Sequence, residues 1–202
     1  MTSSESFART YLDEVAQLAA TIDADALEAI AAGLRATRDR GGRLFLVGVG
    51  GGAGHASHAV CDFRKLADLE AYSPVDNVSE LTARTNDEGW DTTYAAWLRT
   101  SRLSARDALL VFSVGGGSRE HNISMNLVLA VELAKEVGAA VYGLVGRPDG
   151  TTAQLADACV VVDAPAQRTT PHVEGFQAVL WHLIVSHPAL AAQATKWESV
   201  AT

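Results

Sequence analysis

The chain has 202 residues, of which 48% are hydrophobic and 20% charged, and its formal net charge is −8 at pH 7. This length and balance predict one globular domain with its own core, and the acidic excess without a Lys/Arg cluster argues against a nucleic-acid-binding surface. No apolar run approaches the ~18 residues of a membrane span and the first residues do not resemble a signal peptide, so we expect a cytoplasmic protein that makes no membrane contact.

Two helical patterns open the chain, at residues 5–21 and 24–39, where apolar side chains recur at helical spacing. The second pattern ends at Gly41, as helix C-termini commonly do. Beyond this point, buried strands alternate with helices. Strands are predicted at 43–50, 69–74, 107–116, 139–147 and 159–165, and helices at 54–67, within 77–91, and at 91–102, 120–137, 151–158 and 173–186.

Most of these strands are continuous apolar runs, which is typical of strands covered on both faces of a parallel sheet. Their alternation with helices predicts an α/β fold: a three-layer αβα sandwich with a parallel sheet, preceded by N-terminal helices. No linker or internal repeat divides the chain. Residues 1–202 are therefore expected to form a single domain, with leading helices at 1–40 and the α/β core at 41–202.

The cysteines and most of the tryptophans are predicted to have structural roles. Cys61 and Cys159 each have apolar neighbours, so we expect buried free thiols in a reducing compartment. Trp90, Trp97 and Trp181 are expected in the core or at an interface, because large aromatic rings contribute much of the apolar area of both.

Two predicted strands end in glycine-rich loops, residues 48–52 and 113–118. Glycine there lets several backbone N–H groups turn toward one anion, and the following helix adds its positive end. The alternative is a pair of tight strand-to-helix turns. Two such loops, together with the hydroxyls of Ser113 and Ser118, favour a bound phosphate. Neither loop has the Lys-Ser/Thr of a Walker sequence or a clear dinucleotide fingerprint, so we expect a small phosphorylated substrate and no organic cofactor.

The helix after the first loop carries His58 and Asp62, four residues apart and therefore on one face. Taken alone, such a pair favours an exposed hydrogen bond between neighbours over acid–base or metal chemistry. Its position next to a predicted phosphate loop favours the functional interpretation.

The order of these motifs resembles the sugar isomerase (SIS) domain, a flavodoxin-like fold. The shared features are the glycine loop, the H-x-x-x-D helix, "TNDEGW" at residues 85–90, "SVGGGS" at 113–118 and a closing helix with E-x7-H. Within that group, the chain is most similar to phosphoheptose isomerases, which interconvert sedoheptulose 7-phosphate and D-glycero-D-manno-heptose 7-phosphate. The resemblance extends over nearly the whole chain.

This resemblance implies an aldose–ketose isomerase with Asp62 as the base and His182 as its acid–base partner. Asp62 is shorter than the family's glutamate, so Glu174 is the alternative base. Some relatives hold zinc at the matching positions, which implies a zinc site at His58, Asp62, Glu174 and His182. The residues expected to bind the substrate and its phosphate are Gly50, Gly51, Gly52, His55, Asp87, Ser113, Gly115, Gly116 and Ser118.

Several positions depart from the family pattern, which reads G-N-G-G-S and S-T-S-G-N-S in the two loops. Three hydroxyl donors are missing here, at Gly52, Val114 and Gly115. A histidine, His55, replaces an aspartate, and Glu174 replaces a glutamine. These changes leave room for a different sugar phosphate or for a non-catalytic module that binds one.

The zinc set meets a geometric difficulty, because eight residues along a helix correspond to a rise of about 12 Å. Either Glu174 lies at a frayed helix start after Pro171, or it meets His182 of a different subunit. Family members are commonly tetramers whose N-terminal helices pack together. The resemblance therefore implies a homotetramer with active sites between subunits. His121 and His172 are weaker candidates, for phosphate and for metal respectively.

Overall fold

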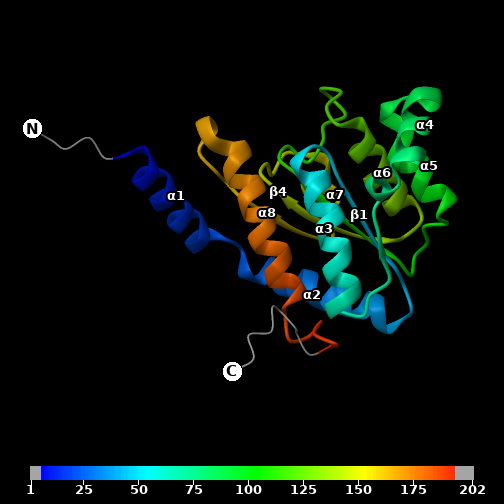
Figure 1. Ribbon diagram of the computed structural model, residues 1–202, viewed down its shortest axis with the longest axis horizontal. Coiled ribbons are helices and arrows are strands. Elements are labelled where there is room, and N and C mark those ends of the chain that lie inside the picture. Colours follow the sequence, from blue (N-terminus) through cyan, green and yellow to red (C-terminus); the bar gives the residue numbers. More distant parts are fainter. Residues whose placement is uncertain (1–5, 194–202) are drawn as a thin grey trace, which may run out of the picture.

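The computed structural model describes residues 6–193 and places a five-stranded sheet at its centre (Figure 1). The strand order is β2-β1-β3-β4-β5 and every neighbouring pair is parallel, as predicted. All but the edge strands are fully buried along most of their length, which matches their continuous apolar sequence. The strands are β1 Leu44–Gly48, β2 Ala71–Tyr72, β3 Ala108–Ser113, β4 Ala140–Val145 and β5 Ala158–Val161.

Helices cover both faces of the sheet, which confirms the three-layer prediction. Buried side chains of α2, α3 and α8 pack on one face, and those of α5 and α6 pack on the other. In Figure 1, α3 and α8 lie side by side across the sheet, and the two helices are in contact. The helices are α1 Phe7–Thr21, α2 Ala24–Asp39, α3 Gly51–Leu66, α4 Val78–Glu88, α5 Thr93–Thr100, α6 Met125–Glu136, α7 Thr151–Leu155 and α8 Thr169–Val185, with single 3-10 turns at Pro74–Asp76, Trp90–Thr92 and Ala166–Arg168.

The two leading helices differ in how they contact this body. Helix α2 begins at the N-cap Asp23, whose carboxylate accepts the Ala26 amide at 3.0 Å, and it buries Ile30 and Leu34 completely in the core. Helix α1 extends away from the sheet (Figure 1) and exposes Phe7 and Leu12. The body of the protein therefore includes α2, whereas α1 has an apolar face open to solvent in the single chain.

A charged cluster connects α1 to the start of α8. The Glu14 carboxylate accepts hydrogen bonds from Arg168, with the closest contact involving Nη2, and lies 2.8 Å from Nε2 of His172. The His172 ring also stacks on Tyr11 with the ring centroids 4.3 Å apart. Hydrogen bonds from Arg168 and then His172 lower the pKa of Glu14 to about 2.

This lowered pKa predicts that the attachment of α1 is lost in acid. The Glu14 carboxylate stabilises the folded state above its ordinary pKa of 4.5, and the contribution disappears as the pH falls toward the folded value of about 2. Glu14→Gln is expected to lower the unfolding midpoint at pH 6 and to flatten its decline between pH 5 and pH 2.5. The exposed neighbour Asp13 provides the control, Asp13→Asn. An acid decline equally steep in wild type and Glu14→Gln would contradict the assignment.

Three predicted helix starts are wrong. Helix α3 begins at Gly51, not at residue 54, so the first glycine loop includes the first turn of the helix. Helix α6 begins at Met125, not at 120, because Ser118 and Ile123 pair as a small β-bridge and Ser124 takes a left-handed conformation. Helix α8 begins at Thr169, four residues before the predicted start at 173.

The predicted burial of the thiols is only partly correct. Cys61 is exposed on α3, contrary to the prediction, and Cys159 is half-buried on β5, where burial raises the pKa of its thiol to about 12. Of the tryptophans, Trp181 is fully buried, Trp97 packs against the core and Trp90 is 38% exposed. Among residues 6–193, no helix combines the length and the hydropathy of a membrane span.

Candidate functional site

The sheet topology places both glycine loops at one crevice. In the order β2-β1-β3-β4-β5, the helix after β1 (α3) packs on one face and the helix after β3 (α6) packs on the other. Gly48 at the end of β1 is paired with Phe112 near the end of β3. Ligands of open α/β sheets bind where successive strands lead to opposite faces. The two glycine loops, residues 48–52 and 113–118, follow β1 and β3 and therefore lie on either side of this binding position.

The first loop is packed backbone against backbone. Gly50 has φ +60, which a side chain would strain. A Cβ on Gly48 would lie 2.3 Å from the carbonyl carbon of Gly52, and one on Gly52 would lie 2.5 Å from the Phe112 carbonyl oxygen. The Gly52 amide donates to the Val49 carbonyl oxygen at 3.1 Å, and the Ala53 amide donates to the Gly50 carbonyl oxygen at 3.1 Å. Among the described residues, the Gly50 and Gly51 amides are the loop donors that remain for an anion at the start of α3.

The second loop keeps two hydroxyls at its ends. Oγ of Ser113 accepts the Gly116 amide at 3.0 Å, and Oγ of Ser118 accepts the His121 amide at 3.3 Å. A hydroxyl that accepts still has its own O–H to donate, so both serines remain possible phosphate ligands. Beside the loop lies a hollow of about 290 Å³, whose lining includes Gly115, Ser118, His121, Arg147 and Asp149.

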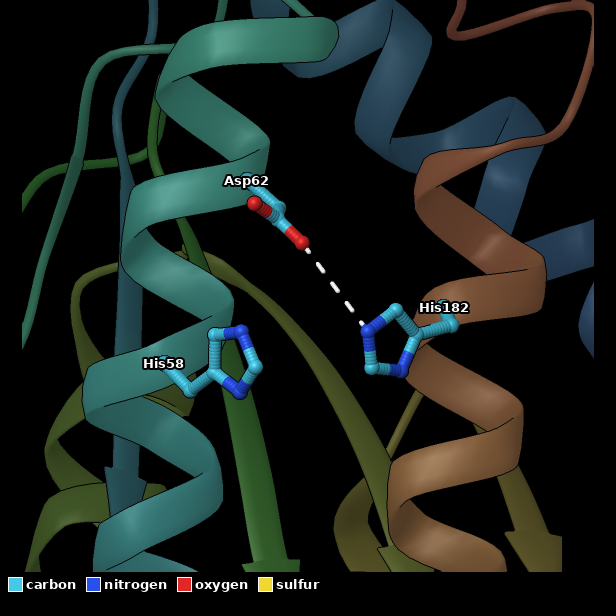
Figure 2. Close-up of side chains that lie close together, drawn as sticks. All are labelled: His58, Asp62 and His182. Carbon is cyan, nitrogen blue, oxygen red and sulfur yellow. Dashed lines mark ion pairs between the residues drawn. The ribbon is translucent and has the colours of Figure 1, made fainter. Parts of the chain in front are cut away.

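Three side chains predicted to carry chemistry meet between α3 and α8. One ligand atom from each of His58, Asp62 and His182 lies within 4.8 Å of the others. Figure 2 shows the Asp62 carboxylate and the His182 ring facing each other across the gap between the helices, with His58 one turn away on α3. Asp62 is only 8% exposed, which contradicts the alternative of an exposed local pair for the carboxylate, whereas His58 is exposed.

The hydrogen bonding of His182 determines which of its ring nitrogens faces Asp62. Nδ1 lies 2.7 Å from the Ala178 carbonyl oxygen, which can only accept, so Nδ1 carries a proton. Nε2 faces Oδ2 of Asp62 at 4.0 Å. When the imidazole is neutral, both Nε2 of His182 and the Asp62 carboxylate are hydrogen-bond acceptors, and they face each other. Such a pair is stabilised by a proton or a cation between the two atoms.

Trp181 fixes the orientation of both histidine rings. Its indole stacks on His182 with the ring centroids 3.4 Å apart and meets the edge of His58 at 4.8 Å. Trp181 was predicted as a core or interface residue, and its burial confirms the core assignment. Its contact with the cluster was missed, although its place directly before His182 in the sequence was a usable signal.

The cluster has the chemistry of a zinc site. Imidazole nitrogens and a carboxylate oxygen are ordinary zinc ligands, and three protein ligands leave a fourth position open. The hydrogen bond from Nδ1 of His182 to a backbone carbonyl is the outer-sphere contact that zinc-binding histidines usually make. The residues present therefore fit the metal that the resemblance implies.

Glu174 lies apart from this cluster in the single chain. Its carboxylate contacts Gly51, where a Cβ would be 2.6 Å from Cδ. Since Glu174 contacts the start of α3 and His182 faces Asp62 further along, α3 and α8 run in the same direction. Glu174 lies inside α8, which begins at Thr169, so the alternative of a frayed helix start is wrong. The alternative of different subunits stays a prediction.

His55 lies next to Glu174 at the first turn of α3. Burial lowers the pKa of His55 below its ordinary value, although the nearby Glu174 carboxylate acts to raise it, and the charges of His58 and His182 lower it further. His55 therefore lies within electrostatic range of the three-residue cluster. Along α3, His55 therefore lies between the first glycine loop, where Glu174 makes its contact, and the α3–α8 cluster.

The remaining candidates lie elsewhere. Asp87 is exposed near the end of α4 and accepts a hydrogen bond from Nδ2 of Asn86 at 2.7 Å. His172, a weaker metal candidate, is buried against Tyr11 and Glu14 and is not a member of the α3–α8 cluster. His121 lines the hollow beside the second loop.

Comparisons with known proteins give a consistent family. The family model for the SIS domain matches residues 10–146. The lincomycin biosynthesis protein LmbN of Streptomyces lincolnensis is 34% identical over 90% of this chain and 69% of its own length. The phosphoheptose isomerase of Rhodospirillum rubrum is 30% identical over 80% of this chain and 81% of its own. Among solved structures, phosphoheptose isomerase GmhA from Neisseria gonorrhoeae shares the fold with a TM-score of 0.77 and 24% identity, over 88% of this chain and 94% of that one.

Proposed function

The chain belongs to the SIS domain family, and on that premise we propose that it is an aldose–ketose isomerase of the phosphoheptose isomerase type. The proposed reaction converts D-sedoheptulose 7-phosphate to D-glycero-D-manno-heptose 7-phosphate in the cytoplasm. The observation that carries this proposal is the buried Asp62 facing His182 and His58 between α3 and α8, on the helix that begins at the first glycine loop. The named relatives that are phosphoheptose isomerases support the substrate.

The loops supply the binding end of the site. The phosphate would be held by the amides of Gly50 and Gly51, the hydroxyls of Ser113 and Ser118, and the positive end of α3. The Gly52 amide donates to the Val49 carbonyl oxygen, so Gly52 would contribute its close packing rather than a donor. His58 and Asp62 lie seven and eleven residues beyond Gly51, rises of about 10 and 16 Å along the helix. The substrate would therefore lie extended along α3, with its phosphate at the loop and its carbonyl end toward the cluster.

The α3–α8 cluster supplies the proton transfers. Asp62 accepts a proton from C1 of the ketose while the C1–C2 double bond of the enediolate forms. His182 moves a proton between the two oxygens, and the same carboxylic acid returns a proton to C2, which leaves the aldehyde at C1. C1 is oxidised as C2 is reduced, so no external oxidant or reductant is consumed.

Zinc is the metal that we propose for this site, held by His58, Asp62 and His182, with Glu174 as a further ligand if a neighbouring subunit brings it close. When bound, the ion would act as a Lewis acid toward the developing oxyanion. If Asp62 is a ligand and Glu174 is not, Glu174 is the carboxylate left for proton transfer. Comparison of Asp62→Asn with Glu174→Gln separates these two assignments.

We also propose that the active protein is a homotetramer. Phe7 and Leu12 on α1 are 72% and 55% exposed, and Val179 and Leu183 on α8 are 58% and 43% exposed. An apolar hollow of about 330 Å³ lies between these two helices. Val179 and Leu183 lie on α8 within one turn of His182, so a second copy on this face would shield the cluster from water.

A second candidate keeps the chemistry and changes the sugar. The 34% identity to LmbN exceeds the 30% identity to the Rhodospirillum rubrum isomerase. Both loops also lack hydroxyls that the family uses at Gly52, Val114 and Gly115. A sugar phosphate of a natural-product pathway is therefore the alternative substrate.

The experiment that tests both candidates is a panel of five- to seven-carbon ketose phosphates, assayed with and without a chelator, together with the metal content of the purified protein. We expect turnover of sedoheptulose 7-phosphate, about one zinc per chain, and loss of activity on chelation that added zinc restores. Preference for a shorter sugar would select the second candidate. Ligand-dependent thermal stabilisation without any turnover would indicate a non-catalytic module.

A further inference from the structure

Tyr94 on α5 makes a buried contact with the first glycine loop. The side chain is completely buried, and its hydroxyl donates a hydrogen bond to the Gly48 carbonyl oxygen at 2.6 Å. The two residues are 46 positions apart in the sequence. Burial raises the pKa of Tyr94 to about 12, so the hydroxyl remains a donor at any pH that a cell reaches.

The carbonyl that Tyr94 binds lies where β1 ends and the loop begins. Gly48 is the last residue of β1, and the backbone of Gly52 fills the space where its Cβ would lie. The Phe112 carbonyl oxygen of β3 occupies the corresponding space at Gly52. Gly48, Gly52 and Phe112 are therefore in mutual van der Waals contact, so a shift of the Gly48 peptide would displace the amides of Gly50 to Gly52.

Tyr94 also connects the loop to the segment before α5. The Trp90 ring meets the Tyr94 ring edge to face, with the centroids 5.5 Å apart. Trp90 lies two residues beyond the end of α4, which carries the predicted substrate residue Asp87. A single side chain thus contacts both the first loop and the segment that follows Asp87.

We propose that Tyr94 is a positioning residue that sets the first glycine loop for the phosphate of the substrate. The inference rests on the proposed function, because the loop matters to catalysis only if it binds a phosphate. Without the Tyr94 hydroxyl, the buried Gly48 carbonyl oxygen loses its side-chain donor, and the loop backbone shifts to a different conformation. The reacting end of the sugar is held elsewhere, by the α3–α8 cluster.

The test is Tyr94→Phe, which keeps the ring and removes only the hydroxyl. KM for sedoheptulose 7-phosphate is expected to rise about tenfold with kcat within about twofold, and the dissociation constant of inorganic phosphate, measured by calorimetry, is expected to rise by the same factor. The matched control is Tyr142→Phe, in which a second buried hydroxyl is removed from β4, where it lies against Gly33 of α2. This control is expected to change neither constant.

Calorimetry also separates the two proposals. If wild type binds phosphate but turns over no sugar, the isomerase assignment fails, while the phosphate affinities of the two variants still test Tyr94. Equal phosphate affinity in wild type and Tyr94→Phe would overturn the positioning role, as would equal losses in Tyr94→Phe and Tyr142→Phe. Thermal unfolding of both variants verifies that each is folded at the assay temperature.

Discussion

Asp62→Asn is expected to lower kcat by about 10²- to 10⁴-fold while leaving the protein folded, and His182→Ala is expected to have an effect of similar size. Asparagine has the shape of aspartate and fills the same buried space between α3 and α8, but its amide cannot accept a proton from carbon. The measurement is steady-state turnover of sedoheptulose 7-phosphate, with circular dichroism of each variant to verify folding.

Controls for this pair come from the same helices. Asp68→Asn changes an exposed carboxylate just beyond the end of α3 and is expected to keep full activity. Glu174→Gln tests the alternative base, which contacts the start of α3. Full activity of Asp62→Asn together with inactivity of Glu174→Gln would transfer the base role to Glu174. Full activity of Asp62→Asn, His182→Ala and Glu174→Gln would remove these side chains from the mechanism.

Gly52→Ser is expected to destabilise the protein by about 3 kcal/mol and to abolish phosphate binding, although it restores a hydroxyl that the family carries at this position. The reason is steric. A Cβ at residue 52 would lie 2.5 Å from the Phe112 carbonyl oxygen, a rigid backbone atom of β3. The new side chain must therefore push α3 away from the sheet and disturb the loop.

The matched control for Gly52→Ser lies half a turn further along α3. A Cβ at Gly54 would meet nothing within 4 Å, so Gly54→Ser is expected to be neutral or slightly stabilising. Urea unfolding and phosphate calorimetry of both variants test the prediction. Tighter phosphate binding by a fully stable Gly52→Ser would show that the loop is not packed as described.

The sheet was predictable because strands buried on both faces appear in the sequence as continuous apolar runs. Runs such as residues 44–47 and 108–112 contain no polar residue, and a glycine follows within three residues of the end of each. The N-terminal helices were equally clear, since α2 presents an apolar stripe after the N-cap Asp23. Parallel pairing then placed both loops at one edge, as expected for this connectivity.

Helix starts were less predictable because glycine residues at a helix start give no helical signal in the sequence. Gly51 and Gly52 have low helix propensity. Their helical conformation accompanies close packing of Gly51 against Glu174 and of Gly52 against Phe112, which local preference does not contain. The residues from Ser118 to Ser124 have helix-compatible composition, but the Ser118–Ile123 bridge holds them outside α6. Both errors reflect tertiary contacts that a local pattern does not contain.

The candidate site was predictable in part. The spacing of His58 and Asp62 placed them on one face of α3, and the resemblance added His182, which does lie beside them. The separation of Glu174 from His182 was also predictable, because eight residues along one helix rise about 12 Å. The contact of Glu174 with Gly51 depends on how α3 and α8 pack, which no spacing within either helix encodes. The Trp181 contact and the Tyr94 hydrogen bond likewise depend on how separate helices meet.

The most direct test of the α3–α8 cluster as the chemical centre is proton NMR of sedoheptulose 7-phosphate incubated with the protein. Wild type and Asp68→Asn are expected to produce the H1 signal of the aldose at equal rates, and the double variant Asp62→Asn/His182→Ala is expected to produce none above background. Formation of the aldose by the folded double variant at the wild-type rate would contradict the proposed mechanism.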